Sequence, residues 1–168
     1  FNYRGSWGTP GDFSFAHGIE DTAAALAYLR QPDVARKLRL DPTRIVLIGH
    51  SMGGFMTVQA AAADPAIKAF ATLSAADLTW HAQQLVRKDG DTAGIRAMAD
   101  GLADEGMAPL SGCTPDGLAR ELVAHAPGWA FPSKVGALKN RTALIVTSDD
   151  GLAAENQAFA ADLRKAGD

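Results

Sequence analysis

Ser51 is the residue of this chain whose neighbours best suit it to chemistry. It lies in the sequence Gly49-His50-Ser51-Met52-Gly53, which has the Gly-x-Ser-x-Gly pattern of a nucleophilic serine. Such a serine attacks a carbonyl carbon when a base takes its proton and N–H groups stabilise the oxyanion that forms. Because the pattern is short, it predicts this chemistry only where a strand precedes the serine and a helix follows it.

The residues on either side of Ser51 predict that strand and that helix. Residues 45–48 are large and apolar, which favours a strand buried on both faces, as in a parallel sheet. Met52–Ala63 is small and apolar with no helix breaker before Asp64-Pro65, which favours a buried helix. The flanking sequence therefore supplies the strand, turn and helix that a nucleophilic serine requires.

The other residues of the pattern have predicted roles around that turn. Gly49, Gly53 and the adjacent Gly54 carry no Cβ atom, so strand and helix can approach closely. The backbone N–H of Met52, at the start of the helix, is a candidate oxyanion donor. The alternative is a turn that only packs or that binds phosphate, although the Gly-Lys-Ser/Thr ending of phosphate-binding loops is absent from the sequence.

The rest of the chain predicts an α/β fold, a parallel sheet flanked by helices. Strands are expected at residues 67–73 and 143–147, and helices at 14–30, 34–38 and 154–166. The long stretch between the last two strands predicts a helical, cap-like insertion, with helices at 82–88, 94–102 and 115–124. We therefore divide the chain into core residues 1–76, insertion 77–140, and core residues 141–168.

Composition excludes several other functions. The 168 residues carry a formal net charge of −3, which argues against nucleic acid as a partner. No apolar run approaches the ~20 residues that span a bilayer. Cys113 is the only cysteine, and no Cys/His spacing indicates a metal site, so we expect neither metal nor cofactor. The compartment, cytoplasmic or secreted, stays open.

Three segments resemble enzymes of the α/β-hydrolase superfamily, in particular prolyl-oligopeptidase-like and dienelactone-hydrolase-like serine hydrolases. Residues 2–8 (Asn-Tyr-Arg-Gly-Ser-Trp-Gly) resemble the loop after the fourth core strand, residues 41–54 the turn that carries the nucleophile, and residues 143–150 the seventh strand with its acid loop. The resemblance implies a partial α/β-hydrolase fold that lacks elements at both ends. It also implies that a second oxyanion donor lies upstream of Phe1.

The resemblance further implies a catalytic acid after a late strand, because triad members in this fold follow the order serine, acid, histidine. Asp149 and Asp150 directly follow the predicted strand 143–147. The family pattern is strand-Gly-x-x-Asp, and placing Thr147 on that glycine puts Asp150 on the acid, although threonine in place of glycine leaves Asp149 open. Asp77, after the second strand, is a third candidate, and each of the three is alternatively a turn or cap residue.

The same order places the general base after the acid, where this sequence has no histidine. His17, His50, His81 and His125 all precede Asp149. The resemblance implies that His50 packs or bonds beneath the turn, while His81 and His125 fall in the insertion. We therefore expect the catalytic histidine beyond Asp168, and we expect this chain alone to be nearly inactive.

The expected function is hydrolysis of carboxylic esters through an acyl-enzyme on Ser51. A prolyl-oligopeptidase-type peptidase is the alternative within the class, and a non-catalytic binding protein or an inactive fragment is the alternative outside it. The substrate would be a small ester or a short peptide. Apolar residues of the insertion are candidates to line the substrate pocket, above all Trp80 and Trp129, with Leu85, Met98 and Phe131.

Overall fold

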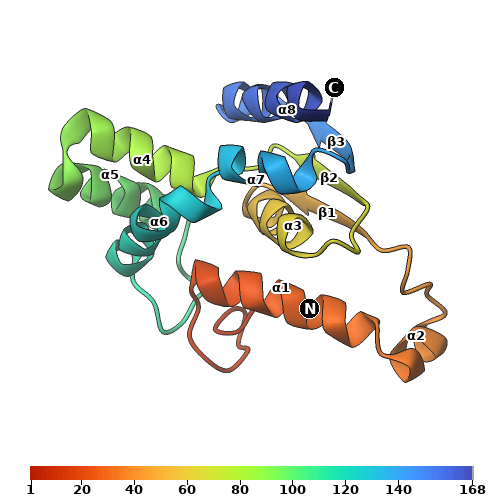
Figure 1. Cartoon of the computed structure of the whole chain (residues 1–168). Coiled ribbons are helices and arrows are strands. Elements are labelled where there is room, and N and C mark those ends of the chain that lie inside the picture. The colour runs from red at the N-terminus through yellow and green to blue at the C-terminus, as the bar shows by residue number, and fades with distance from the viewer. Residues whose placement is uncertain (168) are drawn as a thin grey trace. The chain divides into compact units, whose positions relative to one another are not determined.

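The computed structural model describes residues 1–167, which form helices and one small sheet (Figure 1). The helices are α1 Phe15–Leu29, α2 Pro32–Leu38, α3 Met52–Ala63, α4 Leu78–Asp89, α5 Asp91–Asp104, α6 Pro115–Trp129, α7 Phe131–Leu138 and α8 Ala153–Gly167. The strands are β1 Val46–His50, β2 Ala69–Leu73 and β3 Thr142–Val146. None of the helices within these residues is both long enough and apolar enough to cross a bilayer.

The three strands form a parallel sheet in the order β1-β2-β3. In the last paired row, His50 of β1 lies opposite Leu73 of β2, which lies opposite Val146 of β3. The predicted α/β class, a parallel sheet flanked by helices, is therefore confirmed. Because the strands are parallel, the turns that follow all three leave from the same edge of the sheet.

The chain divides into two compact units, which we describe separately. A sheet unit contains residues 22–77 and 131–167, and a helical unit contains Phe1–Asp21 with Leu78–Ala130. Each of the three helices predicted within residues 77–140 lies inside α4, α5 or α6. The division into residues 1–76, 77–140 and 141–168 stays a prediction, because the compact units follow contacts rather than these boundaries.

The sheet unit has its core where α3 packs on β1 and β2 and where α7 packs on α3 and α8. Helix α3 is apolar on all sides and is buried from Gly54 to Ala61, as expected of a helix in a core. The ring of Phe131 lies 6.4 Å from that of Phe55 and 5.0 Å from that of Phe159, between centroids. Phe131, a sequence candidate for the substrate pocket, therefore belongs to this core.

The opposite face of the sheet is apolar and open to solvent in the described residues. Side chains alternate between the faces of a strand, so Val46 and Ile48 of β1 share one face with Leu144 and Val146 of β3. Ile48 is 70% exposed and Leu144 61%. The strand predicted at residues 45–48 is present, but the prediction that both its faces are buried is wrong, because helices among residues 1–167 cover one face only.

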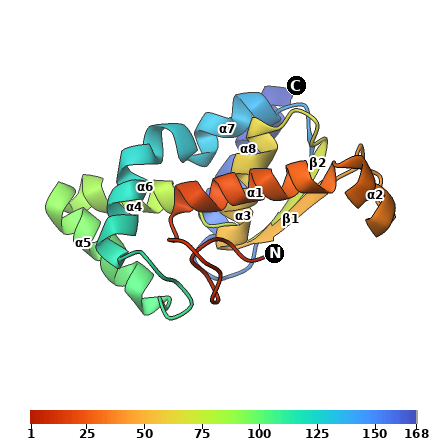
Figure 2. The same cartoon turned by 90° about the horizontal axis from the view of Figure 1, so that it is seen from below.

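In the helical unit, α4, α5 and α6 pack against one another, and α4 and α5 run side by side (Figure 2). The approach of α4 to α5 depends on Gly94, because a Cβ atom there would lie 2.5 Å from the backbone nitrogen of Val86. The chain start joins this unit through backbone hydrogen bonds, from Trp7 N–H to the Pro109 carbonyl (2.8 Å) and from Ser111 N–H to the Gly5 carbonyl (2.8 Å).

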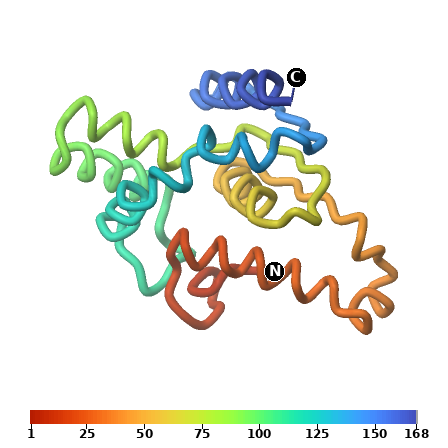
Figure 3. The backbone as a smooth tube through the Cα atoms, in the orientation of Figure 1, coloured from red at the N-terminus to blue at the C-terminus, as the bar shows by residue number. Residues whose placement is uncertain are grey.

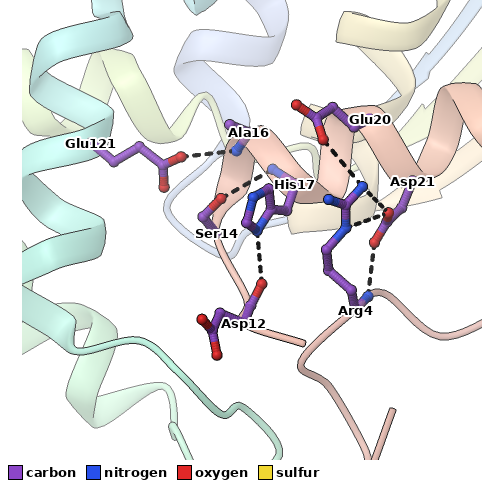
Figure 4. A network of polar contacts seen from close by, with 8 residues as sticks. All are labelled: Arg4, Asp12, Ser14, Ala16, His17, Glu20, Asp21 and Glu121. Carbon is purple, nitrogen blue, oxygen red and sulfur yellow. Dashed lines mark hydrogen bonds and ion pairs between the residues drawn. The ribbon is translucent and has the colours of Figure 1, made fainter. Parts of the chain in front are cut away.

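Side chains complete this attachment of the chain start (Figure 4). The Arg4 guanidinium Nε donates to Asp21 Oδ1 at 2.7 Å, and the Arg4 backbone N–H donates to Asp21 Oδ2 at 2.8 Å. The Glu121 carboxylate of α6 accepts the N–H groups of Phe15 and Ala16 at 2.9 Å each, which caps the start of α1. Residues about one hundred positions apart in the sequence are thus held in one unit.

We predict that Phe55→Ala lowers the free energy of unfolding by about 3–5 kcal/mol, because it removes a ring that is fully buried and leaves a cavity. Urea denaturation followed by circular dichroism measures this change. The matched control is Tyr28→Ala, which removes a ring that is 55% exposed and is expected to change stability by no more than about 0.5 kcal/mol. Equal stability of the two variants would contradict the packing described above.

Candidate active site

Ser51 occupies a strained turn between β1 and α3. Figure 3 shows the path of the backbone through the described residues, coloured by residue number. The Ser51 φ of 52° and ψ of −119° are rare for a residue with a side chain. The Ser51 N–H donates to the Leu73 carbonyl at 3.1 Å, and the Ser51 carbonyl accepts the N–H of Gly54 at 2.9 Å and of Ala76 at 3.2 Å. The predicted strand, turn and helix are therefore all present, and hydrogen bonds on both sides hold the turn.

The glycines around Ser51 differ in how closely other atoms approach them. A Cβ atom on Gly49 would overlap the backbone carbonyl of Gly53 and the Thr57 hydroxyl, and one on Gly54 would overlap the Ala75 side chain. No described atom lies within 4 Å of the corresponding position on Gly53. The close approach of strand and helix thus explains Gly49 and Gly54, but in the described residues it does not explain Gly53.

Met52 is the first residue of α3, where backbone N–H groups have no partner within the helix. The helix dipole adds a partial positive charge at this end. The predicted oxyanion donor therefore lies directly beside Ser51 at the positive end of a helix. His50, the last residue of β1, is exposed.

The turn after β3 holds Asp150 through neutral hydrogen-bond donors. Ser148 Oγ donates to Asp150 Oδ2 at 2.7 Å, and the Leu152 N–H donates to Asp150 Oδ1 at 3.1 Å. Hydrogen bonds from the hydroxyls of Ser74 and Ser148, and then from the Leu152 N–H, lower the pKa of Asp150 to about 2. Asp150 is thus an ionised carboxylate in a fixed orientation; Asp149, next to it, is exposed.

The turns of Ser51 and Asp150 lie at the same edge of the sheet, joined by the segment that follows β2. Leu73, the last residue of β2, accepts the Ser51 N–H, as described above, and Ser74, the next residue, donates its N–H to the Val146 carbonyl at 2.8 Å. The structure therefore brings together the predicted nucleophile, the predicted oxyanion donor and the predicted acid turn within one compact unit.

Asp77, the third sequence candidate for the acid, has a different environment. It is 2% exposed, and its Oδ2 accepts the Phe131 N–H at 2.7 Å, at the start of α7. Its own N–H donates to Glu155 Oε1 at 2.8 Å. Asp77 thus connects α7 and α8 to the end of β2, whereas the carboxylate of Asp150 is accessible to solvent.

Four of the five residues predicted to line the substrate pocket lie in the helical unit, whereas Phe131 belongs to the core of the sheet unit. Trp80 in α4 and Trp129 at the end of α6 are half-buried. Each contacts a histidine: the His125 ring stacks on Trp129 with centroids 4.1 Å apart, and the His81 ring meets Trp80 edge-on at 5.1 Å. Their proposed contact with substrate stays a prediction.

The remaining candidate groups of the helical unit have local roles. His17 Nδ1 lies 2.8 Å from the Asp12 carbonyl oxygen (Figure 4). Cys113 borders a cavity of about 430 Å³, and burial, followed by the carboxylates of Asp12 and Glu121, raises the pKa of its thiol. The thiol therefore stays protonated and weakly nucleophilic. Within residues 1–167, no three His, Cys, Asp or Glu side chains gather as a metal site.

Sequence reasoning missed Ser74, Ser148 and Asn156, which surround the acid turn. Asn156 Nδ2 donates to the Ala75 carbonyl at 2.7 Å and to the Leu152 carbonyl at 2.8 Å. A signal for the two serines was present, because both follow the ends of parallel strands, and such ends meet at one edge.

Comparisons with known proteins agree with this arrangement. A sequence profile of the alpha/beta hydrolase family matches residues 1–167. A solved structure from a study of carboxylesterases of the ammonia-oxidizing thaumarchaeon Nitrososphaera gargenis has a similar backbone, with a TM-score of 0.54. The match covers 96% of this chain and 66% of that chain, and the two sequences are 16% identical. At that identity the likeness concerns the fold alone.

We predict opposite outcomes for alanine at two glycines of the serine turn. Gly49→Ala is expected to cost several kcal/mol of unfolding free energy, on the order of other overpacked cores, because its methyl group would overlap backbone atoms. Gly53→Ala is expected to be neutral or to stabilise by up to about 1 kcal/mol, because the site is open and alanine favours helix. Thermal unfolding of the two variants tests this; equal losses would contradict the packing described here.

We also predict a specific pH dependence from Asp150. Its pKa is lower in the folded protein than the usual 3.8, so its stabilising contribution is complete above pH 3.8 and disappears as the pH falls to about 2. The stability difference between wild type and Asp150→Asn should therefore shrink between about pH 5 and about pH 2. Asp149→Asn removes one charge from the same turn and serves as the control. A difference that stays constant over this range would refute the prediction.

Proposed function

Because the chain belongs to the alpha/beta hydrolase family, we propose that its protein is a serine hydrolase that cleaves carboxylic esters through an acyl-enzyme on Ser51. The observation that carries this proposal is the position of Ser51 in a strained strand-to-helix turn, next to the turn that holds the ionised carboxylate of Asp150. The fold similarity to a protein studied as a carboxylesterase favours esters over peptides as substrates.

In the proposed mechanism, Ser51 Oγ attacks the ester carbonyl carbon while a histidine takes its proton. The Met52 N–H stabilises the oxyanion, and the histidine then gives the proton to the leaving alcohol. Water attacks the acyl-enzyme in the second half of the reaction, which releases the acid and restores the Ser51 hydroxyl. Asp150 stays ionised throughout, where it orients the imidazole and stabilises its charged form.

The histidine of this mechanism is proposed to come from outside these 168 residues. All four histidines precede Asp150 in the sequence, contrary to the order of triad residues in this fold. The chain spans 66% of the matched structure's length, so the activity proposed here is that of the whole protein.

We predict that Ser51→Ala lowers ester turnover by the whole protein on the order of 10⁴-fold or more, because it removes the nucleophile. Hydrolysis of synthetic esters and labelling by a fluorophosphonate probe measure the loss. Ser133→Ala, in α7, is the control and is expected to leave both unchanged.

The same assays separate the alternatives. Faster cleavage of aminoacyl amides than of esters would favour the peptidase, and a whole protein whose Ser51 resists the probe would favour a binding protein. The 168-residue chain alone is expected to be nearly inactive. Ester turnover by this chain that is lost in Ser51→Ala would overturn the proposal that the histidine lies elsewhere.

A further inference from the structure

The segment that follows β2 contacts the serine turn and the acid turn at once. The carbonyl of Leu73, the last residue of β2, accepts the Ser51 N–H at 3.1 Å, and the Ala76 N–H of the segment donates to the Ser51 carbonyl at 3.2 Å. Between these two contacts, the Ser74 N–H donates to the Val146 carbonyl of β3 at 2.8 Å. Ser74 therefore lies where movements of one turn would be transmitted to the other.

The side chain of Ser74 is buried and directed toward Asp150. Ser74 is 6% exposed, and its Oγ lies 3.0 Å from Ser148 Oγ, which itself donates to Asp150 Oδ2 at 2.7 Å. Each hydroxyl carries one hydrogen, so Ser74 donates either to Asp150 directly or to Ser148. In both arrangements two hydroxyl groups support one carboxylate.

The backbone of Ser74 is in a conformation that favours glycine. Its φ is 43°, in the left-handed region where a side chain is unfavourable. A serine at this position carries a conformational cost that glycine would avoid. Unlike glycine, serine provides a hydroxyl group at this position.

Asn156 fixes the distance between the two segments that these hydroxyls connect. Its amide is fully buried, and it donates to the Ala75 carbonyl at 2.7 Å and to the Leu152 carbonyl at 2.8 Å. Ala75 follows Ser74, and the Leu152 N–H donates to Asp150 Oδ1. These two hydrogen bonds of Asn156 therefore set the distance between the Ser74 hydroxyl and the turn that holds Asp150.

We propose that Ser74 and Ser148 are positioning residues, whose hydroxyls orient the Asp150 carboxylate toward the catalytic histidine. This inference rests on the proposed role of Asp150 as the acid of the triad. The Ser148 hydroxyl, which contacts the Ser74 hydroxyl, holds Oδ2 while the Leu152 N–H holds Oδ1, so the plane of the carboxylate is fixed before any substrate binds. An imidazole that donates to this carboxylate would meet it in one orientation.

The hydroxyls of Ser74 and Ser148 also affect the electrostatics of Asp150, which groups that only held the turn in place would not do. The groups that lower the pKa of Asp150 to about 2 are neutral donors, first Ser74 and then Ser148. The charged side chain beside Asp150 on the turn, Asp149, is itself acidic. Loss of either hydroxyl should therefore raise the pKa of Asp150 toward 3.8.

The test uses variants that remove a hydroxyl without disturbing the backbone. Ser74→Gly removes the hydroxyl and suits the positive φ, and Ser148→Ala removes the other hydroxyl from an exposed turn. Arg39→Gly is the matched control, because Arg39 has a φ of 55° in the same unit and lies far from the acid turn in the sequence. Ser148→Thr keeps the hydroxyl and should behave as wild type.

The first measurement is an NMR titration of the ¹³C-labelled Asp150 carboxyl in this chain, which needs no catalysis. We expect a pKa of about 2 in wild type and Arg39→Gly, with values nearer 3.8 in Ser74→Gly, in Ser148→Ala and above all in the double variant. An unchanged pKa in all three would overturn this inference and leave the proposed role of Ser51 intact.

The second measurement is ester hydrolysis by the whole protein. Ser74→Gly and Ser148→Ala should each lower kcat about tenfold with KM unchanged, as loss of one hydrogen bond to a charged group implies, and Ser148→Thr should restore kcat. A raised pKa with wild-type kcat would overturn the positioning role. Absence of turnover even in the wild-type whole protein would instead overturn the proposed function.

Discussion

The site depends on two backbone hydrogen bonds between the Ser51 turn and the segment after β2. The φ and ψ of Ser51 are of a kind that costs about 1–3 kcal/mol, so the turn would relax if its surroundings allowed it. The bonds to Leu73 and Ala76 prevent this, and the absence of a Cβ atom on Gly49 lets strand and helix approach this closely. Contacts within the fold therefore hold Ser51 in this conformation.

The same short segment also contacts the turn that holds Asp150, the proposed acid. Ser74 contacts the acid turn through its hydroxyl, and Ala75 is held by Asn156 of α8. Asp77, the next polar residue, holds the start of α7. Leu73 and the four residues that follow it, Ser74–Asp77, thus connect both turns and two helices. The spacing between the Ser51 turn and the Asp150 turn is therefore set by contacts within the sheet unit.

Much of this arrangement could be predicted from the sequence, because it depends on the types of residues that are close together in the chain. The apolar run before Gly49 and the small apolar run after Met52 predict the strand and the helix around Ser51, and both are present. Contacts between distant residues could not be predicted in the same way. The sequence could not show that Asp150, rather than Asp149, accepts a hydrogen bond from the Ser148 hydroxyl.

Other features escaped prediction for the same reason. The bond from Glu121 to the start of α1 joins residues 106 positions apart, and nothing near either residue indicates it. The burial of β1 on both faces was expected from its composition alone, but burial also requires a covering layer. Val46 and Ile48 are residue types that are typical of a strand buried on both faces. Within residues 1–167, however, their side chains lie on the face of the sheet that no helix covers.

The open face of the sheet has a thermodynamic consequence for these residues. The heat capacity change of unfolding and the denaturant m-value both scale with the apolar surface that unfolding exposes. Ile48, Leu144 and their neighbours on that face already contact water in the folded state, so they add little to either quantity. Residues 1–167 should therefore unfold over a broader range of denaturant than a domain of equal length whose sheet is covered on both sides.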